Sequence, residues 1–210
     1  LLHQERYITD IAETYGVSDT KPKSTPLLQG ARLTKEGTPL DNAGKTKYMG
    51  IIGSLLYASL CTRPDIAYAT GALARYSAAP TEQHMRAALG VLQYLYTTKT
   101  KGIKYCGGNG SFKLQTWCDA DYGGDMDTRR STTGFVATLG SGAVLWGSRL
   151  QKTVAASTAE AEYIAASHCT RDMLWLRTLL GELGVNAGTI DIKTDNQAAL
   201  AIIKNPVLSM

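Results

Sequence analysis

Three acidic residues stand where strand-like segments of the sequence give way to helix-like ones, and residues of this type can bind a metal. Asp119 ends the segment Leu-Gln-Thr-Trp-Cys-Asp, Glu162 lies in Ser-Thr-Ala-Glu-Ala-Glu-Tyr, and Asp195 follows Ile-Asp-Ile-Lys-Thr. Carboxylate oxygens are the ligands that Mg²⁺ prefers, and few are needed when a substrate adds phosphate oxygens. The pattern therefore predicts a divalent-metal site that acts on a phosphate group.

Each aspartate also has a purely structural interpretation. Asp119 could be an ordinary polar residue at the start of a loop, and Asp121, close behind it, is a second candidate for an outer role in a metal site. Asp195, between a strand and a helix, is a natural helix N-cap, although a cap and a ligand role can coexist. Only the combination with the other carboxylates favours the ligand role.

The two glutamates have different expected roles. Ser157 and Glu160 have the spacing of a capping box, so Glu160 is predicted to be structural. Glu162 instead shares a helix face with small residues that would bring the helix close to a sheet. These are Ala165, Ala166 and Cys169. A carboxylate on such a face is costly unless it binds a cation or a donor, so Glu162 is the predicted ligand.

The second half of the chain contains the elements that must position these residues. The expected strands cover 112–118, 135–139, 144–146 and 189–194, with a hairpin connection at 140–142. The expected helices start at Ser157, break near Thr170, resume over 172–182 and end with 196–203. The order β-β-β-α-α-β-α predicts an α/β (α+β) fold, with a mixed sheet flanked by helices.

The first half is predicted to be mostly helical. Helices are expected over 5–15, within 47–77 in two parts that meet at Thr62, and over 80–96. Pro64 suits the first turn of the second of these parts. Residues 17–43 should form a long connector, His84 is assigned a solvated or capping role, and the glycines at 107–110 mark the expected domain boundary.

Composition excludes several classes of protein. The 210 residues suffice for one large domain or two small ones, contain no apolar run near the ~20 residues of a membrane span, and do not begin with a signal peptide. The four cysteines lack metal-ligand spacing, which argues against zinc and favours thiols in the core. They are Cys61, Cys106, Cys118 and Cys169.

Charge divides unevenly along the chain. Residues 1–110 contain 13 Lys and Arg against 8 Asp and Glu, whereas residues 111–210 contain 9 against 10. A basic half beside a half with clustered carboxylates suits an enzyme that binds phosphates in one place and cuts in another. A mildly basic solvated surface explains the charge equally well.

Several motifs together resemble a known family. They are Asp119–Asp125, Arg130–Phe135, Gln151–Val154, Ser157–Ile164 and Thr194–Ala198. They are similar to the ribonuclease H domain of copia-type retrotransposon Pol polyproteins, and upstream Tyr48–Tyr57 and Thr62–Tyr68 resemble the connection from the reverse transcriptase. The resemblance implies a thumb or connection segment over 1–108 and a ribonuclease H-like domain over 111–210.

The resemblance also implies a function. It predicts hydrolysis of the RNA strand of RNA–DNA hybrids with two Mg²⁺ or Mn²⁺ ions held by Asp119, Glu162 and Asp195. Expected substrate contacts are Arg130, Ser131, Thr132, Lys152, Asn196 and Gln197. Expected partners are the hybrid and the rest of the polyprotein, including its polymerase and integrase. The expected location is a cytoplasmic virus-like particle or the nucleus, without secretion or a membrane.

The sequence departs from the family at its end. In the family, a fourth carboxylate lies on a late helix beyond the Asn205–Val207 region. This sequence has no counterpart of that carboxylate before Met210. We therefore expect a fragment of a longer polyprotein or a degenerate remnant that lacks the last strand and helix of the domain. The alternative function is a non-catalytic, nucleic-acid-binding connector, which would have no need of the three carboxylates. An unrelated α/β binding domain would require the linked motifs to coincide by chance.

Overall fold

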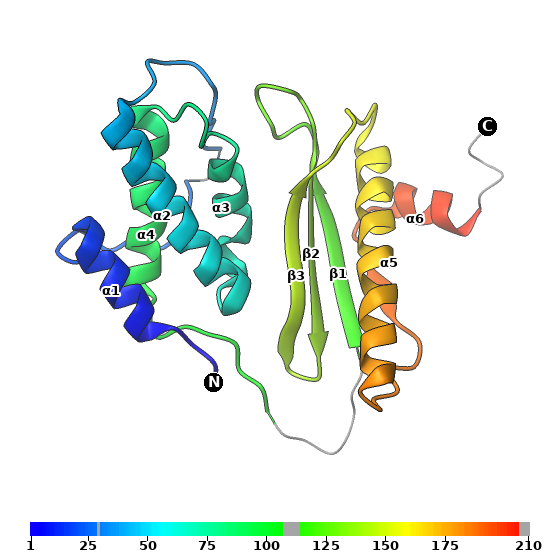
Figure 1. Cartoon of the computed structure of the whole chain (residues 1–210). Helices are drawn as coiled ribbons and strands as arrows, with labels where there is room; N and C mark the ends of the chain where they lie inside the picture. The colour runs from blue at the N-terminus through cyan, green and yellow to red at the C-terminus, as the bar shows by residue number, and fades with distance from the viewer. Residues whose placement is uncertain (29, 107–113, 206–210) are drawn as a thin grey trace. The chain divides into compact units, whose positions relative to one another are not determined.

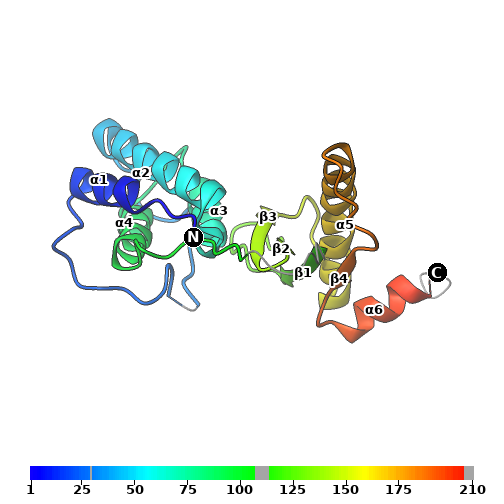
Figure 2. The same cartoon turned by 90° about the horizontal axis from the view of Figure 1, so that it is seen from below.

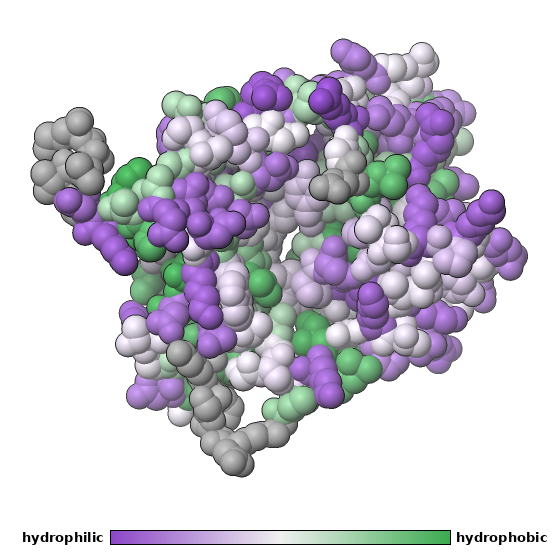
Figure 3. Space-filling view, turned by 180° about the vertical axis from the view of Figure 1, so that it is seen from behind, coloured by the Kyte–Doolittle hydropathy of each residue, from purple (hydrophilic) through white to green (hydrophobic). Residues whose placement is uncertain are grey.

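The computed structural model describes residues 1–28, 30–106 and 114–205. The chain divides into two compact units, Leu1–Ile103 and Lys104–Met210. The glycines expected to mark the boundary lie outside the described residues. None of the helices within the described ranges combines the length and apolar character needed to cross a membrane. On the face seen in Figure 3, hydrophilic side chains alternate with separate apolar areas.

The first unit is helical. Its helices are α1 (Glu5–Tyr15), α2 (Asn42–Cys61), the 3₁₀ turn η1 (Pro64–Ile66), α3 (Ala67–Ala74) and α4 (Glu82–Thr97). They enclose one apolar core, to which each of the four α-helices contributes buried side chains. Figure 1 shows α1, α2 and α4 side by side. Gly16, at φ 72°, ends α1 as the sequence predicted, because glycine adopts the left-handed conformation without strain.

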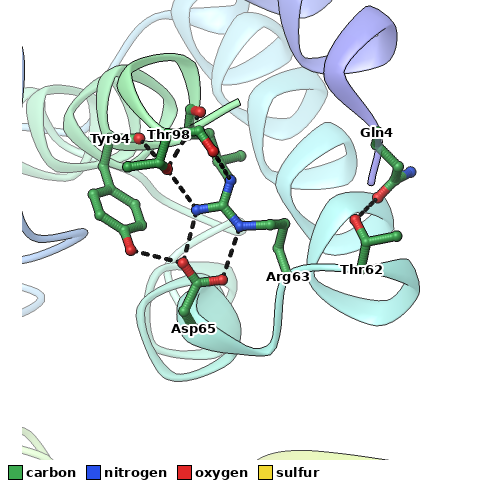
Figure 4. Close-up of polar contacts among 7 residues, drawn as sticks. Gln4, Thr62, Arg63, Asp65, Tyr94 and Thr98 are labelled. Atoms are coloured by element: carbon green, nitrogen blue, oxygen red, sulfur yellow. Dashed lines mark hydrogen bonds and ion pairs between the residues drawn. The ribbon is translucent and has the colours of Figure 1, made fainter. Parts of the chain in front are cut away.

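A buried arginine organises the junction between α2 and α3. The Arg63 side chain donates to both carboxylate oxygens of Asp65, at 2.9 and 2.7 Å, and to the Thr98 carbonyl at 3.1 Å (Figure 4). Tyr94 donates to the same carboxylate at 2.7 Å. Burial raises the pKa of Asp65, but the bonds from Arg63 and Tyr94 outweigh it and lower the pKa overall. The network ties the turn at Pro64 to the end of α4.

His84 has one of its two expected roles. It is fully buried, and its Nδ1 accepts the Thr81 backbone N–H at 2.9 Å in a capping box at the start of α4. Its ring also stacks on Tyr76, with centroids 4.0 Å apart. The capping role is confirmed, and a solvated role is wrong because the imidazole lies between the cap and an aromatic ring.

The second unit is a four-stranded mixed sheet with helices packed on it. The strands are β1 (Leu114–Asp121), β2 (Thr132–Leu139), β3 (Gly142–Leu150) and β4 (Asp191–Lys193), in the spatial order β3-β2-β1-β4. The first three are antiparallel, and β4 is parallel to β1. This arrangement is the predicted α+β fold and is consistent with a ribonuclease H-like sheet.

Two helices complete the unit. The helix α5 (Thr158–Glu182) runs along the sheet, and α6 (Gln197–Lys204) packs against α5 (Figures 1 and 2). Apolar side chains of α5 meet those of β1 and β2 in the core of the unit. The buried members from these three elements are Leu114, Cys118, Phe135, Ala137, Ala166, Cys169, Met173, Leu176 and Leu180. The core therefore holds α5 against the sheet.

Three sequence predictions about this architecture were wrong. The helix expected to break near Thr170 is continuous over 25 residues, because no glycine or proline lies near Thr170 and its hydroxyl bonds within the helix, to the Ala166 carbonyl at 2.8 Å. The strand expected over 189–194 spans only Asp191–Lys193. Cys61 and Cys106 are exposed, so only the other two cysteines lie in the core.

Candidate metal centre

Glu162 lies on the buried face of α5, near the start of the helix. Its exposed fraction is 6%, whereas Glu160 is exposed. The Ser157 hydroxyl accepts the Glu160 N–H at 3.1 Å, and the Glu160 carboxylate accepts the Ala156 N–H at 2.7 Å. The predicted division of roles therefore agrees with the geometry: Glu160 caps the helix, and Glu162 points toward the sheet.

The two aspartates are brought together by the parallel pairing of β1 and β4. Trp117 pairs with Lys193, so Asp119 and Asp195 each lie two residues beyond the same rung. Because side chains alternate along extended chains, residues two positions apart share a face. Both aspartates are exposed at this end of the sheet.

The three carboxylates form one cluster. Asp119, Glu162 and Asp195 each offer an oxygen, and these oxygens all lie within 4.8 Å of one another. No other His, Cys, Asp or Glu of the described ranges belongs to this group. Three acidic groups this close repel one another unless a proton or a cation lies between them.

The electrostatics of Glu162 reflect this crowding. Burial is the largest cause that raises its pKa, and the neighbouring Asp119 and Asp195 raise it further. The Ala120 backbone N–H, which donates to Glu162 Oε1 at 3.2 Å, lowers it in part. The net effect raises the pKa to about 7 from an ordinary value of 4.5. Near neutral pH Glu162 therefore exchanges between its protonated and ionised forms, and a divalent cation that binds the cluster would favour the ionised form.

The donor set fits a hard divalent cation. All three groups supply carboxylate oxygen, with no sulfur or imidazole in the cluster, and this composition suits Mg²⁺ or Mn²⁺ better than zinc or copper. One buried ligand beside two exposed ones leaves the cluster open on the solvent side. A phosphate oxygen and water could complete the coordination from that side.

Asp195 does not cap the following helix. The N-cap of α6 is Asn196, whose Oδ1 accepts the Ala199 N–H at 2.9 Å. The capping alternative for Asp195 is therefore wrong, because the next residue has the side chain and the extended backbone that a cap requires. The Asp195 carboxylate remains available to the cluster.

Two groups at the site were not singled out in the sequence. The Thr194 hydroxyl donates to Glu162 Oε2 at 3.4 Å and accepts the Asn196 N–H at 3.4 Å. The Ala120 amide, described above, holds the other Glu162 oxygen. The position of Thr194 next to Asp195 is only a weak indication in the sequence that its hydroxyl contacts the site. The contact of the Ala120 amide cannot be predicted from residue types, because every residue except proline has such an amide.

The remaining acidic residues near Asp119 lie outside the cluster. Asp121 is exposed at the end of β1. Asp125 is buried and accepts both the backbone N–H and the hydroxyl of Thr128, at 2.8 and 2.7 Å. These bonds close the loop between β1 and β2, so the run of aspartates after Asp119 is at least partly structural.

The residues predicted to contact substrate lie in different environments. Ser131 and Thr132 are buried, the first just before β2 and the second at its first residue, and the Ser131 hydroxyl accepts the Gly123 N–H at 3.1 Å. Lys152 is exposed in the loop before α5, and Arg130 is partly exposed. Gln197 is exposed at the first residue of α6, where Asn196 is the cap. Their contacts with a substrate stay a prediction.

Comparison with known proteins finds homologues of almost the whole chain. These homologues are retrovirus-related Pol polyproteins from plant transposons. The polyprotein of transposon TNT 1-94 from Nicotiana tabacum is 41% identical over 209 residues, which are 97% of this chain and 16% of the relative. The polyprotein of transposon RE1 from Arabidopsis thaliana is 38% identical over 208 residues, which are 98% of this chain and 14% of the relative.

A shorter relative matches most of its own length. An uncharacterized mitochondrial protein of Arabidopsis thaliana is 34% identical over 174 residues, which are 83% of this chain and 71% of the relative. No protein-family model matches the chain. No solved structure matches it either. The chain thus spans about one sixth of the length of the Pol polyproteins that it resembles.

Proposed function

We propose that this chain is the ribonuclease H part of a retrotransposon Pol polyprotein and that it cleaves the RNA strand of RNA–DNA hybrids. The observation that supports this proposal best is the cluster of Asp119, Glu162 and Asp195 at one end of a mixed sheet. Metal ions held by such carboxylates supply an activated water and stabilise the charge that develops on the phosphate.

The residues of the chain have distinct roles in this proposal. Asp119 and Asp195, both exposed, would hold the ions on the solvent side, where phosphate oxygens of the substrate could also bind them. Glu162, buried and held by the Ala120 amide and the Thr194 hydroxyl, provides a ligand of fixed position. Three carboxylates bind a second ion more weakly than the first, so we expect cleavage to be slow in Mg²⁺ and to increase with the concentration of Mn²⁺.

Other parts of the polyprotein, including its polymerase and integrase, are the proposed protein partners. Contacts to the hybrid would come from duplex shape, 2′-hydroxyls and phosphates rather than from base edges. Lys152 and Arg130 are the basic residues of the second unit that we assign to phosphate contacts. Binding should therefore weaken as salt increases.

The test uses an end-labelled RNA–DNA hybrid, an RNA duplex and a DNA duplex, each incubated with the chain across a range of Mn²⁺ and Mg²⁺ concentrations. We expect cuts only in the RNA strand of the hybrid, and none by the variants Asp119→Asn and Glu162→Gln. Glu160→Gln, which changes an exposed glutamate two residues away, is the matched control and should cut like the parent. Equal cutting by Asp119→Asn would refute the proposal. Salt-sensitive binding without any cutting would favour the non-catalytic connector.

A further inference from the structure

Gln151 is a buried polar residue that joins three elements of the second unit. It follows the last residue of β3, its exposed fraction is 1%, and its backbone N–H donates to the Ser131 carbonyl at 2.8 Å. Its side-chain Nε2 donates to Thr133 Oγ1 at 3.1 Å and to the Ala161 carbonyl at 2.9 Å. One carboxamide thus ties the start of β2 and the end of β3 to the first turn of α5.

These contacts lead directly to the candidate metal centre. Thr133 pairs with Ala120 across β2 and β1, and Ala120 donates its N–H to Glu162 Oε1. Ala161, the other acceptor of Gln151, is the residue before Glu162. The contacts therefore form a closed ring from Gln151 through the sheet to Glu162 and back through the helix backbone.

The choice of glutamine has a cost in stability. Gln151 Oε1 is buried and has no hydrogen-bond partner among the residues that the structure describes. Burying an acceptor without a partner destabilises a fold, whereas an apolar side chain of the same shape can be neutral or better. Packing alone thus does not account for a glutamine here, but its two donated bonds do.

We propose that Gln151 is a positioning residue that fixes the start of α5 on the sheet so that Glu162 meets the Ala120 amide and the two aspartates. The inference rests on the proposed function in one respect, because the measurement of metal affinity requires the metal site. Outer residues that orient metal ligands commonly change metal affinity by about 10- to 100-fold when they are replaced. Gln151 acts in this way through the backbone of its neighbours and contacts no metal itself.

The test compares Gln151→Met, which keeps the shape and removes both donors, with a matched control. Thr116→Val also removes a side-chain bond between the sheet and α5, from Thr116 Oγ1 to Met173 Sδ at 3.0 Å, but far along the helix from Glu162. Mn²⁺ affinity is measured by electron paramagnetic resonance. Hydrogen exchange at the Ala120 amide, measured by nuclear magnetic resonance without metal, reports the contact with Glu162 independently.

We expect Gln151→Met to bind Mn²⁺ at least about tenfold more weakly and to exchange the Ala120 amide faster, with both values unchanged in Thr116→Val. Parent-like values in Gln151→Met would overturn the proposal. If the parent itself fails to bind Mn²⁺, the metal site is refuted, and exchange at Ala120 still decides the role of Gln151. If Gln151→Met does not fold, Thr133→Val removes one of the two acceptors and should give smaller changes in the same direction; no change would again overturn the proposal.

Discussion

Replacing Glu162 with glutamine should stabilise the metal-free protein while it removes a metal ligand. Glutamine has the shape of glutamate and keeps an oxygen for the Ala120 amide, but it carries no charge among the neighbouring aspartates. The effect must depend on pH, because the glutamate itself is neutral when it is protonated. Stability and metal binding should therefore change in opposite directions in one variant.

The magnitude follows from the raised pKa of Glu162. The pKa is about 7 in the folded protein and 4.5 for an ordinary glutamate. A carboxyl whose pKa is raised on folding favours the folded state below the unfolded value, and this contribution is lost as pH rises from about 4.5 through about 7. At 1.36 kcal/mol per pKa unit, the ionised group costs the folded state at most roughly 3 kcal/mol near pH 8. The exposed aspartates let water screen the cluster, so we expect about 2 kcal/mol.

The assay is urea unfolding followed by tryptophan fluorescence at about pH 5 and pH 8. All three tryptophans, Trp117, Trp146 and Trp175, lie in the second unit, so the signal reports the unit that contains Glu162. Glu162→Gln should be more stable than the parent by about 2 kcal/mol near pH 8 and by less than about 1 kcal/mol near pH 5. Glu160→Gln should show no such dependence on pH.

Saturating Mg²⁺ adds a second arm to the same experiment. A ligand that binds only the folded state stabilises it in proportion to the logarithm of its concentration over Kd, so Mg²⁺ should stabilise the parent at pH 8 and affect Glu162→Gln little. A variant no more stable than the parent at pH 8, or equally more stable at both pH values, would show that Glu162 is not a strained carboxyl of an acidic cluster.

Three further variants test the neighbouring assignments. Asp195→Asn should lower the pKa of Glu162 by removing a negative neighbour and should also abolish stabilisation by Mg²⁺ in thermal melts; retained stabilisation would exclude Asp195 as a ligand. Glu160→Ala should cost about 1 kcal/mol of unfolding free energy by losing its bond to the Ala156 N–H, with parent-like Mn²⁺ affinity in calorimetry. Arg63→Met should destabilise the first unit by about 3 kcal/mol because Asp65 loses its paired cation. Melting by circular dichroism should then shift while tryptophan fluorescence does not, and coincident shifts would contradict the assignment to one unit.

Local patterns in the sequence were enough to predict most of the elements. The helix over Glu5–Tyr15 and the hairpin between β2 and β3 are confirmed, because their stops and alternations are local signals, whereas the strand before α6 is shorter than predicted. The continuity of α5 was missed, because the break expected near Thr170 does not occur and the helix runs from Thr158 to Glu182. Tertiary packing of α5 on the sheet overrides such small local preferences.

The sequence was enough to predict the three carboxylates of the candidate site, but not the contacts that hold them in position. Residue type and position pointed to Asp119, Glu162 and Asp195, and the capping-box spacing separated Glu160 from Glu162. The ring through Gln151 depends on strand register and on a backbone carbonyl, neither of which can be read from residue types. The N-cap at Asn196 was misplaced by one residue because Asp and Asn are both good caps.

Because α5 is unbroken, a small rotation of the helix about one end displaces the other end by a much larger distance. Its 25 residues span about 37 Å, with Glu162 near one end and Leu180, buried in the core, about 27 Å away near the other. A pivot of about 5° at the distant end would move Glu162 by about 2 Å, several times the tolerance of about 0.5 Å that a functional site allows. We therefore expect a change of side-chain volume at Leu180, remote from the carboxylates, to alter metal binding without touching the site.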